Sequence, residues 1–190
     1  MAPIEGHGGD VIEPGHNNVI VTAHPDDETL WCGGLPIRFS DRKWTVICCT
    51  IPRADPVRAE KFFDACRVLG ATPVLRRYLE TEPMDFRGLD LSEFDCVVSH
   101  NPGGEYGHPQ HKEVSRFVLS NYRASQTMLF GYGGQIKTVT DIILDPQEYS
   151  QKLAALKCYD HQSPSDSQPK WKALLDRYFP NGGFHRESYC

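Results

Sequence analysis

The chain has 190 residues, a formal net charge of −5 from 20 basic and 25 acidic side chains, and 39% hydrophobic residues. This length suits one compact domain that needs no disulfide to complete its core. The acidic balance argues against a nucleic-acid partner and against a basic membrane-surface protein, because both depend on clustered Lys and Arg. The composition also excludes an intrinsically disordered chain.

The sequence has no segment that would carry the chain to or across a membrane. Its longest apolar runs, such as residues 46–49, are far too short to cross a bilayer. Residues 1–17 lack the basic start and apolar stretch of a secretory signal. The seven cysteines form no CxxC pair, and an odd count without a signal indicates a reducing compartment. We therefore expect a soluble cytoplasmic protein.

Short, continuously apolar runs alternate with amphipathic stretches along the chain, as in strands that are covered on both faces. The runs predicted as strands are residues 18–23, 44–50, 72–79, 96–99 and 128–130. The stretches predicted as helices are residues 56–69, 109–121, 146–159 and 169–178. This alternation predicts an α/β fold with a mostly parallel central sheet. Residues 1–17 are expected to be a loose N-terminal segment, and residues 18–190 a single domain.

Polar side chains follow the first predicted strand directly, in the sequence His24-Pro-Asp26-Asp27-Glu28. One interpretation is a loop that begins a helix, with Asp26 or Asp27 as the N-cap and Glu28 in the first turn. The other is a cation site, because neighbouring carboxylates repel one another unless a cation lies between them. In open α/β sheets ligands bind beyond the carboxyl ends of the strands, where this loop lies.

A second polar cluster follows the fourth predicted strand, at residues 100–111. His108 comes just before a predicted helix and His111 falls in its first turn. His111 precedes Val114 by three residues and Val118 by seven, so it shares their inward face. A single histidine of this kind is more often a helix cap or a packed core side chain. Two clusters of metal-ligand types at two strand ends favour a metal site instead.

The two clusters together supply the side chains of a catalytic metal centre. His24, Asp27 and His111 offer two imidazoles and one carboxylate and leave a position open for water, as in catalytic zinc sites. Water bound to such a zinc ion becomes a nucleophile near pH 7. Asp26 is a candidate to accept its proton, and His108 to donate to the oxyanion or to the leaving nitrogen.

At these positions the sequence resembles the LmbE/PIG-L family of metal-dependent N-deacetylases. Residues 23–28 read AHPDDE with a glycine pair at 33–34, and residues 104–111 read GEYGHPQH. The similarity extends to an Arg/Glu helix that ends in Leu-Gly at residues 69–70, and to a late segment at residues 152–162. The resemblance implies a Rossmann-like three-layer sandwich that hydrolyses the acetamide of an N-acetylated amino sugar or its conjugate, by attack of a zinc-bound water.

The resemblance also implies roles for individual residues. One Zn²⁺ per chain would bind to His24, Asp27 and His111, with Fe²⁺ or another divalent metal as the alternative. Asp26 would be the general base, His108 would stabilise the tetrahedral intermediate, and Tyr106 would assist near the oxyanion.

Three further residues are candidates for substrate binding. Arg58 matches a substrate-contacting arginine of the family, and the alternative for it is a surface ion pair with Glu60. Trp31 lies close to the HPDDE sequence and is a candidate to line the pocket, although tryptophans are more often core residues. Asp85, in the loop after the third strand, is a candidate for a contact with a sugar hydroxyl.

Gln110 departs from the family pattern, because many members carry Asp between the two histidines. A carboxylate partner that would charge His108 is therefore missing at this position, and Glu105 is the candidate to replace it.

Two other functions fit parts of the sequence. One is a non-catalytic sugar-binding module with the same fold. The other is a 2-His-1-carboxylate non-haem iron enzyme, since His24-Pro-Asp26 is also an HxD sequence, although those sites lie on all-β jelly rolls.

Overall fold

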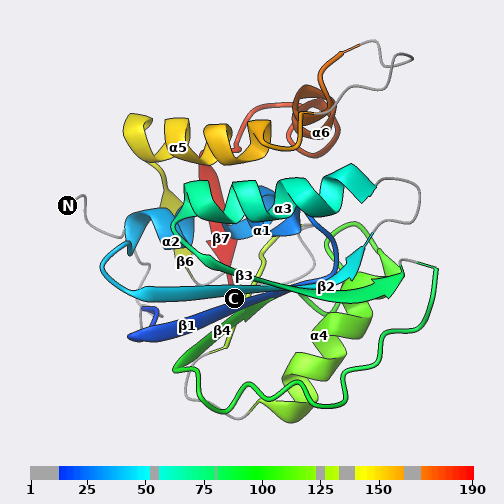
Figure 1. Ribbon diagram of the computed structural model, residues 1–190. Coiled ribbons are helices and arrows are strands. Elements are labelled where there is room, and N and C mark those ends of the chain that lie inside the picture. The colour runs from blue at the N-terminus through cyan, green and yellow to red at the C-terminus, as the bar shows by residue number, and fades with distance from the viewer. Residues whose placement is uncertain (1–12, 52–55, 80, 123–126, 133–139, 161–167) are drawn as a thin grey trace.

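Helices cover both faces of one central sheet in the computed structural model (Figure 1). The structure describes residues 13–51, 56–79, 81–122, 127–132, 140–160 and 168–190. Its strands are β1 (Asn17–Thr22), β2 (Lys43–Ile51), β3 (Thr72–Leu79), β4 (Cys96–Ser99), β5 (Thr127–Leu129), β6 (Thr140–Ile143) and β7 (Arg186–Tyr189). Its helices are α1 (Asp27–Cys32), α2 (Gly34–Arg38), α3 (Pro56–Leu69), α4 (Pro109–Asn121), α5 (Pro146–Lys157) and α6 (Lys170–Tyr178).

The five-stranded central sheet is parallel throughout, in the order β3-β2-β1-β4-β5. The chain builds outward from β1 to β2 and β3, then returns to place β4 on the other side of β1. The predicted mostly parallel α/β sandwich is confirmed. The order reverses between β1 and β4, and such a switch point is where open α/β sheets bind their ligands. Both polar clusters of the sequence follow these two strands.

The continuous apolar runs are explained by the two faces of the sheet. Ile20 of β1 packs into a core with α1, α2, α3 and α5, whereas Val19 and Val21 pack into a second core with α4. All three side chains are fully buried. Because successive strand residues point to opposite faces, a strand covered on both sides needs an apolar residue at each position.

The structure contains elements that the sequence did not predict. Helices α1 and α2 have six and five residues, too few for an apolar period to be recognised. Strands β6 and β7 form a separate antiparallel pair, and β7 reads Arg-Glu-Ser-Tyr, which carries no apolar signal. Residues 1–12 of the predicted N-terminal segment lie outside the described residues.

All seven cysteines are free thiols, and five of them are buried. Burial raises the pKa of Cys49 and of Cys96 to about 12, so these thiols stay protonated and act as small apolar side chains. Within the described part of the chain, no helix has the length and apolar character needed to span a membrane.

A buried ion pair joins α5 to β7 underneath α1. Lys152 Nζ lies 2.6 Å from Glu187 Oε1, with both side chains almost inaccessible to solvent. Nζ also donates to the carbonyl oxygen of Phe184 at 3.1 Å and faces that of Leu30, the fourth residue of α1, at 3.4 Å. The N–H of Gly34 donates to Glu187 at 2.7 Å, and a Cβ at Gly34 would come within 2.9 Å of the same carboxylate. The pair therefore ties α1 and α2 to the C-terminal part of the chain.

Lys152→Met should lower the free energy of unfolding by about 3–5 kcal/mol, because it leaves the Glu187 carboxylate buried without a cation. The double variant Lys152→Met/Glu187→Gln removes both charges, keeps an acceptor for Gly34, and should recover much of the loss. Urea unfolding of the wild type and both variants measures the effect. Equal stability of the single variant and the wild type would contradict the anchoring role.

Candidate metal centre

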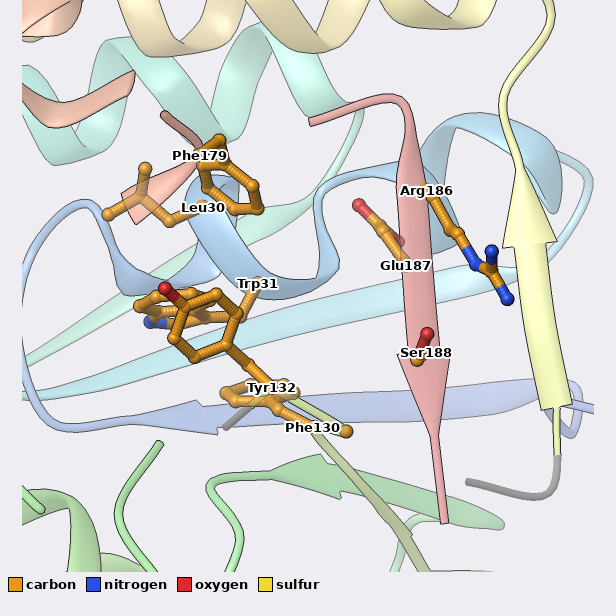
Figure 2. A pocket seen from close by; sticks show the side chains of 9 residues that line it. Leu30, Trp31, Phe130, Tyr132, Phe179, Arg186, Glu187 and Ser188 are labelled. Carbon is orange, nitrogen blue, oxygen red and sulfur yellow. The ribbon is translucent and has the colours of Figure 1, made fainter. Parts of the chain in front are cut away.

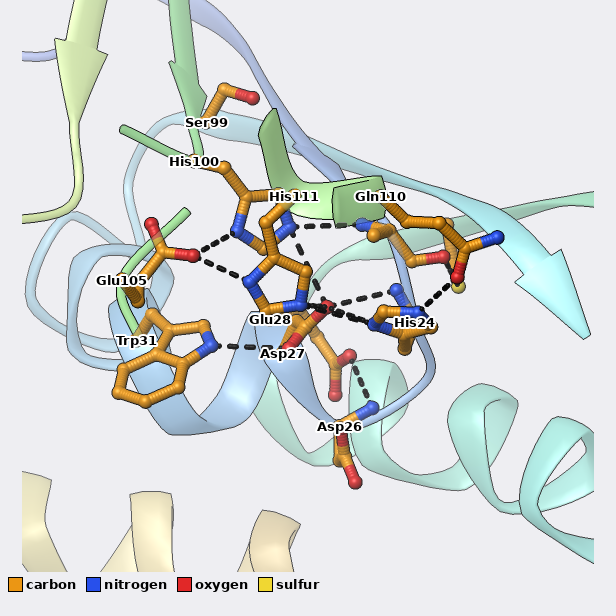
Figure 3. Close-up of polar contacts among 12 residues, drawn as sticks. His24, Asp26, Asp27, Glu28, Trp31, Ser99, His100, Glu105, Gln110 and His111 are labelled. Atoms are coloured by element: carbon orange, nitrogen blue, oxygen red, sulfur yellow. Dashed lines mark hydrogen bonds and ion pairs between the residues drawn. The ribbon is translucent and has the colours of Figure 1, made fainter. Parts of the chain in front are cut away.

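Three side chains from two loops converge at the switch point between β1 and β4 (Figure 3). His24 follows β1, Asp27 begins α1, and His111 lies in the first turn of α4. Nδ1 of His24 is 3.2 Å from Oδ2 of Asp27 and 3.1 Å from Nε2 of His111. The third side of this triangle, from His111 Nε2 to Asp27 Oδ2, measures 3.3 Å.

This triangle fits one face of a tetrahedral metal site. Ligand atoms at about 2.1 Å from a tetrahedral zinc ion lie about 3.4 Å from one another. The three measured separations are close to that value, and the fourth corner of the tetrahedron is left for water or substrate. Two imidazoles and one carboxylate are also the donor set of catalytic zinc sites. The residues present therefore fit a zinc ion.

Outer partners hold two of the three donors in place. The indole N–H of Trp31 donates to Oδ1 of Asp27 at 3.0 Å. Nδ1 of His111 lies 2.5 Å from Oε2 of Glu105, which places the proton on Nδ1 and leaves a lone pair on Nε2. Burial raises the pKa of Glu105, but His100 and His111 outweigh it and bring the pKa to about 2. The prediction that Glu105 is the partner of His108 is wrong, because the carboxylate faces the other two histidines.

His100 is fully buried beside the triangle, and its nitrogens are already engaged. Nδ1 lies 2.8 Å from Glu105, and the backbone N–H of Ala23 donates to Nε2 at 2.9 Å. Burial lowers the pKa of His100, whereas Glu105 and Asp27 raise it to about 9. The Ala23 N–H nonetheless needs a lone pair on Nε2, so we assign the neutral ring with its proton on Nδ1. His100 is thus a supporting residue rather than a fourth ligand.

Asp26 has a backbone conformation that L residues rarely adopt, with φ at +103°. It occupies the N-cap position of α1, but its side chain makes no capping hydrogen bond. Instead Oδ1 accepts from Arg58 Nη2 at 2.8 Å, while Arg58 Nε donates to the carbonyl oxygen of Pro25 at 2.7 Å. Burial raises the pKa of Asp26, and Arg58 opposes this shift. Asp26 is therefore the N-cap residue by position, as one interpretation predicted, but its side chain pairs with Arg58 and does not cap the helix.

Glu28 stabilises the loop that contains Asp26 through hydrogen bonds of its carboxylate. Its carboxylate accepts from the backbone N–H of Asp26 at 3.0 Å, from Thr29 Oγ1 at 2.6 Å and from the hydroxyl of Tyr159 at 2.7 Å. Burial raises the pKa of Glu28 to about 7. The contact with Tyr159 connects the loop to the end of α5, far along the chain.

His108 lies on the open side of the triangle, where its ring centre is 4.6 Å from that of His24. Its Nδ1 is buried and has no hydrogen-bond partner among the described residues. Burial, together with the neighbouring His24 and His111, lowers the pKa of His108 to about 4. The ring is therefore neutral at pH 7. The Oε1 atom of Gln110, two residues further along the chain, lies 2.8 Å from Nε2 of His24.

Tyr106 borders the same open side and is 43% exposed. Its ring centre lies 5.3 Å from that of His111 and 5.7 Å from that of His108. The ring of Tyr178, from α6, packs against that of Tyr106, with 5.2 Å between the ring centres. The sequence analysis did not identify Tyr178, because nothing in the local pattern of α6 indicates that it reaches a loop some seventy positions earlier.

No family model matches the chain. Two curated relatives are named 1D-myo-inositol 2-acetamido-2-deoxy-alpha-D-glucopyranoside deacetylase. The protein from Corynebacterium kroppenstedtii is 28% identical over 48% of this chain and 37% of its own length. The protein from Nocardia farcinica is 26% identical over 65% of this chain and 57% of its own length. The chain thus spans well under two thirds of the length of these relatives.

Solved structures with the same fold include the N,N'-diacetylchitobiose deacetylase of Pyrococcus horikoshii, with a TM-score of 0.65 and 18% identity over 92% of this chain and 83% of that chain. A deacetylase of the teicoplanin biosynthetic pathway has a TM-score of 0.61 and 15% identity, covering 92% and 98% of the two chains. The resemblance to the LmbE/PIG-L deacetylases is confirmed. The same fold also occurs in the 4-carboxy-2-hydroxymuconate hydratase of Pseudomonas putida, with a TM-score of 0.60 and 15% identity over 91% and 95% of the chains.

The three candidate substrate residues of this LmbE/PIG-L-like chain each contact other protein groups. Arg58 forms an ion pair with Asp26 and donates to the carbonyl oxygen of Pro25. Trp31 is buried, and its indole N–H donates to Asp27. The Asp85 carboxylate is engaged with Arg87 in an exposed loop. Their roles in substrate binding stay predictions.

A separate cavity of about 220 Å³ lies on the far side of α1 (Figure 2). Aromatic rings form one wall and β7 forms the other. Its lining residues are Leu30, Trp31, Phe130, Gly131, Tyr132, Phe179, Arg186, Glu187 and Ser188. Among them, only Trp31 also contacts the triangle, through its bond to Asp27. The cavity is therefore distinct from the metal centre.

In the metal-free protein, His108 should titrate near pH 4 rather than near 6.5. Because this pKa is depressed in the folded state, the neutral ring stabilises the fold above pH 6.5, and that contribution is lost as the pH falls through 4. NMR titration of the imidazole Cε1–H resonances measures the midpoint, and His108→Gln identifies the peak by its loss. A midpoint at or above 6.5 would show that the ring has a carboxylate partner after all.

Proposed function

We propose that this protein is a metal-dependent hydrolase that removes the N-acetyl group from an N-acetylated amino sugar or its conjugate. The observation that carries the proposal is the triangle of donor atoms from His24, Asp27 and His111. Asp26 is adjacent to Asp27 in the chain, and the His108 ring centre lies 4.6 Å from that of His24. The names of the two curated relatives, which are deacetylases of an acetamido sugar, support the same reaction. The metal would be one Zn²⁺ ion held by the three donors.

A zinc ion at this position would lower the pKa of its water toward neutrality and polarise the acetamide carbonyl. Asp26 is the residue that accepts the proton. It is buried beside Asp27, and the ion pair with Arg58 holds its carboxylate in one orientation. The proton that Asp26 receives then passes to the leaving nitrogen, so that acetate and a free amine are the products.

His108 and Tyr106 are the residues that stabilise the developing negative charge on the acetamide oxygen. The depressed pKa of His108 makes it a neutral hydrogen-bond donor, and a neutral imidazole can fill this role. Tyr106 supplies a hydroxyl at the exposed edge of the same opening. Since the ring of His108 is neutral at pH 7, the proton for the leaving amine is assigned to Asp26.

The two alternative functions account for fewer of these observations. A sugar-binding module without chemistry would not need an Asp26 carboxylate fixed by Arg58 in a strained backbone. Facial-triad iron enzymes are typical of all-β folds, whereas this sheet is parallel and covered by helices. The seven free thiols support a reducing compartment, and we place the protein in the cytoplasm.

Release of primary amine from a panel of N-acetylated amino sugars tests the function directly. Asp26→Asn should keep the zinc ion but lose turnover by about 10²- to 10⁴-fold, because the general base is gone. Asparagine is preferred to alanine here because it tolerates a positive φ. His111→Ala should lose the zinc ion, measured as metal content after gel filtration.

The matched control is Asp64→Asn on the outer surface of α3, where the carboxylate pairs with Arg67. It should leave both zinc content and turnover unchanged. Normal turnover by Asp26→Asn would remove Asp26 from the role of base. A zinc-loaded wild type that releases no amine from any sugar of the panel would contradict the proposed substrate class.

A further inference from the structure

We propose that Gln110 is a positioning residue that fixes His24 as a metal ligand through Nδ1. The inference rests on the proposed metal centre and adds a role for Gln110, which takes no part in the proposed reaction. Oε1 of Gln110 lies 2.8 Å from Nε2 of His24, and both residues are buried (Figure 3). The other nitrogen of the same ring, Nδ1, is the corner of the donor triangle.

The contact with Gln110 decides which nitrogen of His24 carries the proton. A neutral imidazole has one N–H and one lone pair, and the partner of one nitrogen sets the state of the other. An amide oxygen can only accept, so Nε2 of His24 carries the hydrogen. Nδ1 is then left with the lone pair directed toward Asp27 and His111. Without the amide, the proton could reside on Nδ1 and the ring could turn away from the metal.

His24 and His111 are thus supported in the same way by different chemical groups. Nδ1 of His111 faces the carboxylate of Glu105, whereas Nε2 of His24 faces a neutral amide. This difference follows from the local charge. Asp26, Asp27 and Glu105 are already buried in and around the centre, and Arg58 pairs with Asp26. An amide accepts the hydrogen bond without adding another buried negative charge.

Zinc affinity, measured by competition with a chromogenic chelator, tests the role of Gln110. Gln110→Met keeps the length of the side chain but removes the acceptor, and it should weaken zinc binding about 10- to 100-fold. Gln110→Glu restores an acceptor at the same distance from His24 and should bind zinc at least as tightly as the wild type. Gln151→Met is the matched control, because Gln151 is exposed and its amide donates to the carbonyl oxygen of Val68 in α3.

Imidazole ¹⁵N chemical shifts of the zinc-loaded wild type give a readout that needs no variant to fold. His24 should carry its proton on Nε2. A proton on Nδ1, or equal zinc affinity of Gln110→Met and the wild type, would overturn the positioning role and leave the hydrolase proposal intact. A wild-type protein that binds no zinc would overturn both.

Discussion

The parallel pairing of β1 with β4 at the centre of the sheet is the constraint on which the site depends. It places the loop that follows β1 beside the loop that follows β4, although the two are about eighty residues apart in the chain. His24 and Asp27 come from the first loop, and His111 comes from the helix that the second loop begins. A one-residue shift in this register would separate the donor atoms by more than 3 Å, since that is the rise of a strand per residue.

Burial of several carboxylates in one small region creates the electrostatic problem that the neighbouring residues solve. Glu105 and Asp27 are held ionised by the surrounding imidazoles, so their pKa values are lowered despite burial. Glu28 accepts hydrogen bonds from two hydroxyls and one backbone amide, and burial raises its pKa to about 7. Imidazoles thus compensate Asp27 and Glu105, whereas Arg58 pairs with Asp26. The amide of Gln110 accepts a hydrogen bond without adding another charge.

Segments near the C-terminus support the centre from outside without entering it. The hydroxyl of Tyr159 holds Glu28, and Lys152 with Glu187 holds the carbonyl end of α1 and the start of α2. Tyr178 packs against Tyr106 at the opening. Helix α1 has only six residues and would be marginal alone, so these tertiary contacts are what keep Asp27 and Asp26 in position.

The alternation of apolar runs and amphipathic stretches determined the α/β fold, because strands covered on both faces and helices covered on one differ in their period. The residue types and their position after strands brought His24, Asp27 and His111 together as candidates, since parallel strands end at one edge. Only the tertiary structure decided that Arg58 holds Asp26, that Glu105 faces His100 and His111, and that Gln110 faces His24. Those contacts depend on where side chains point between elements that are distant in sequence, and no local period or spacing records that direction.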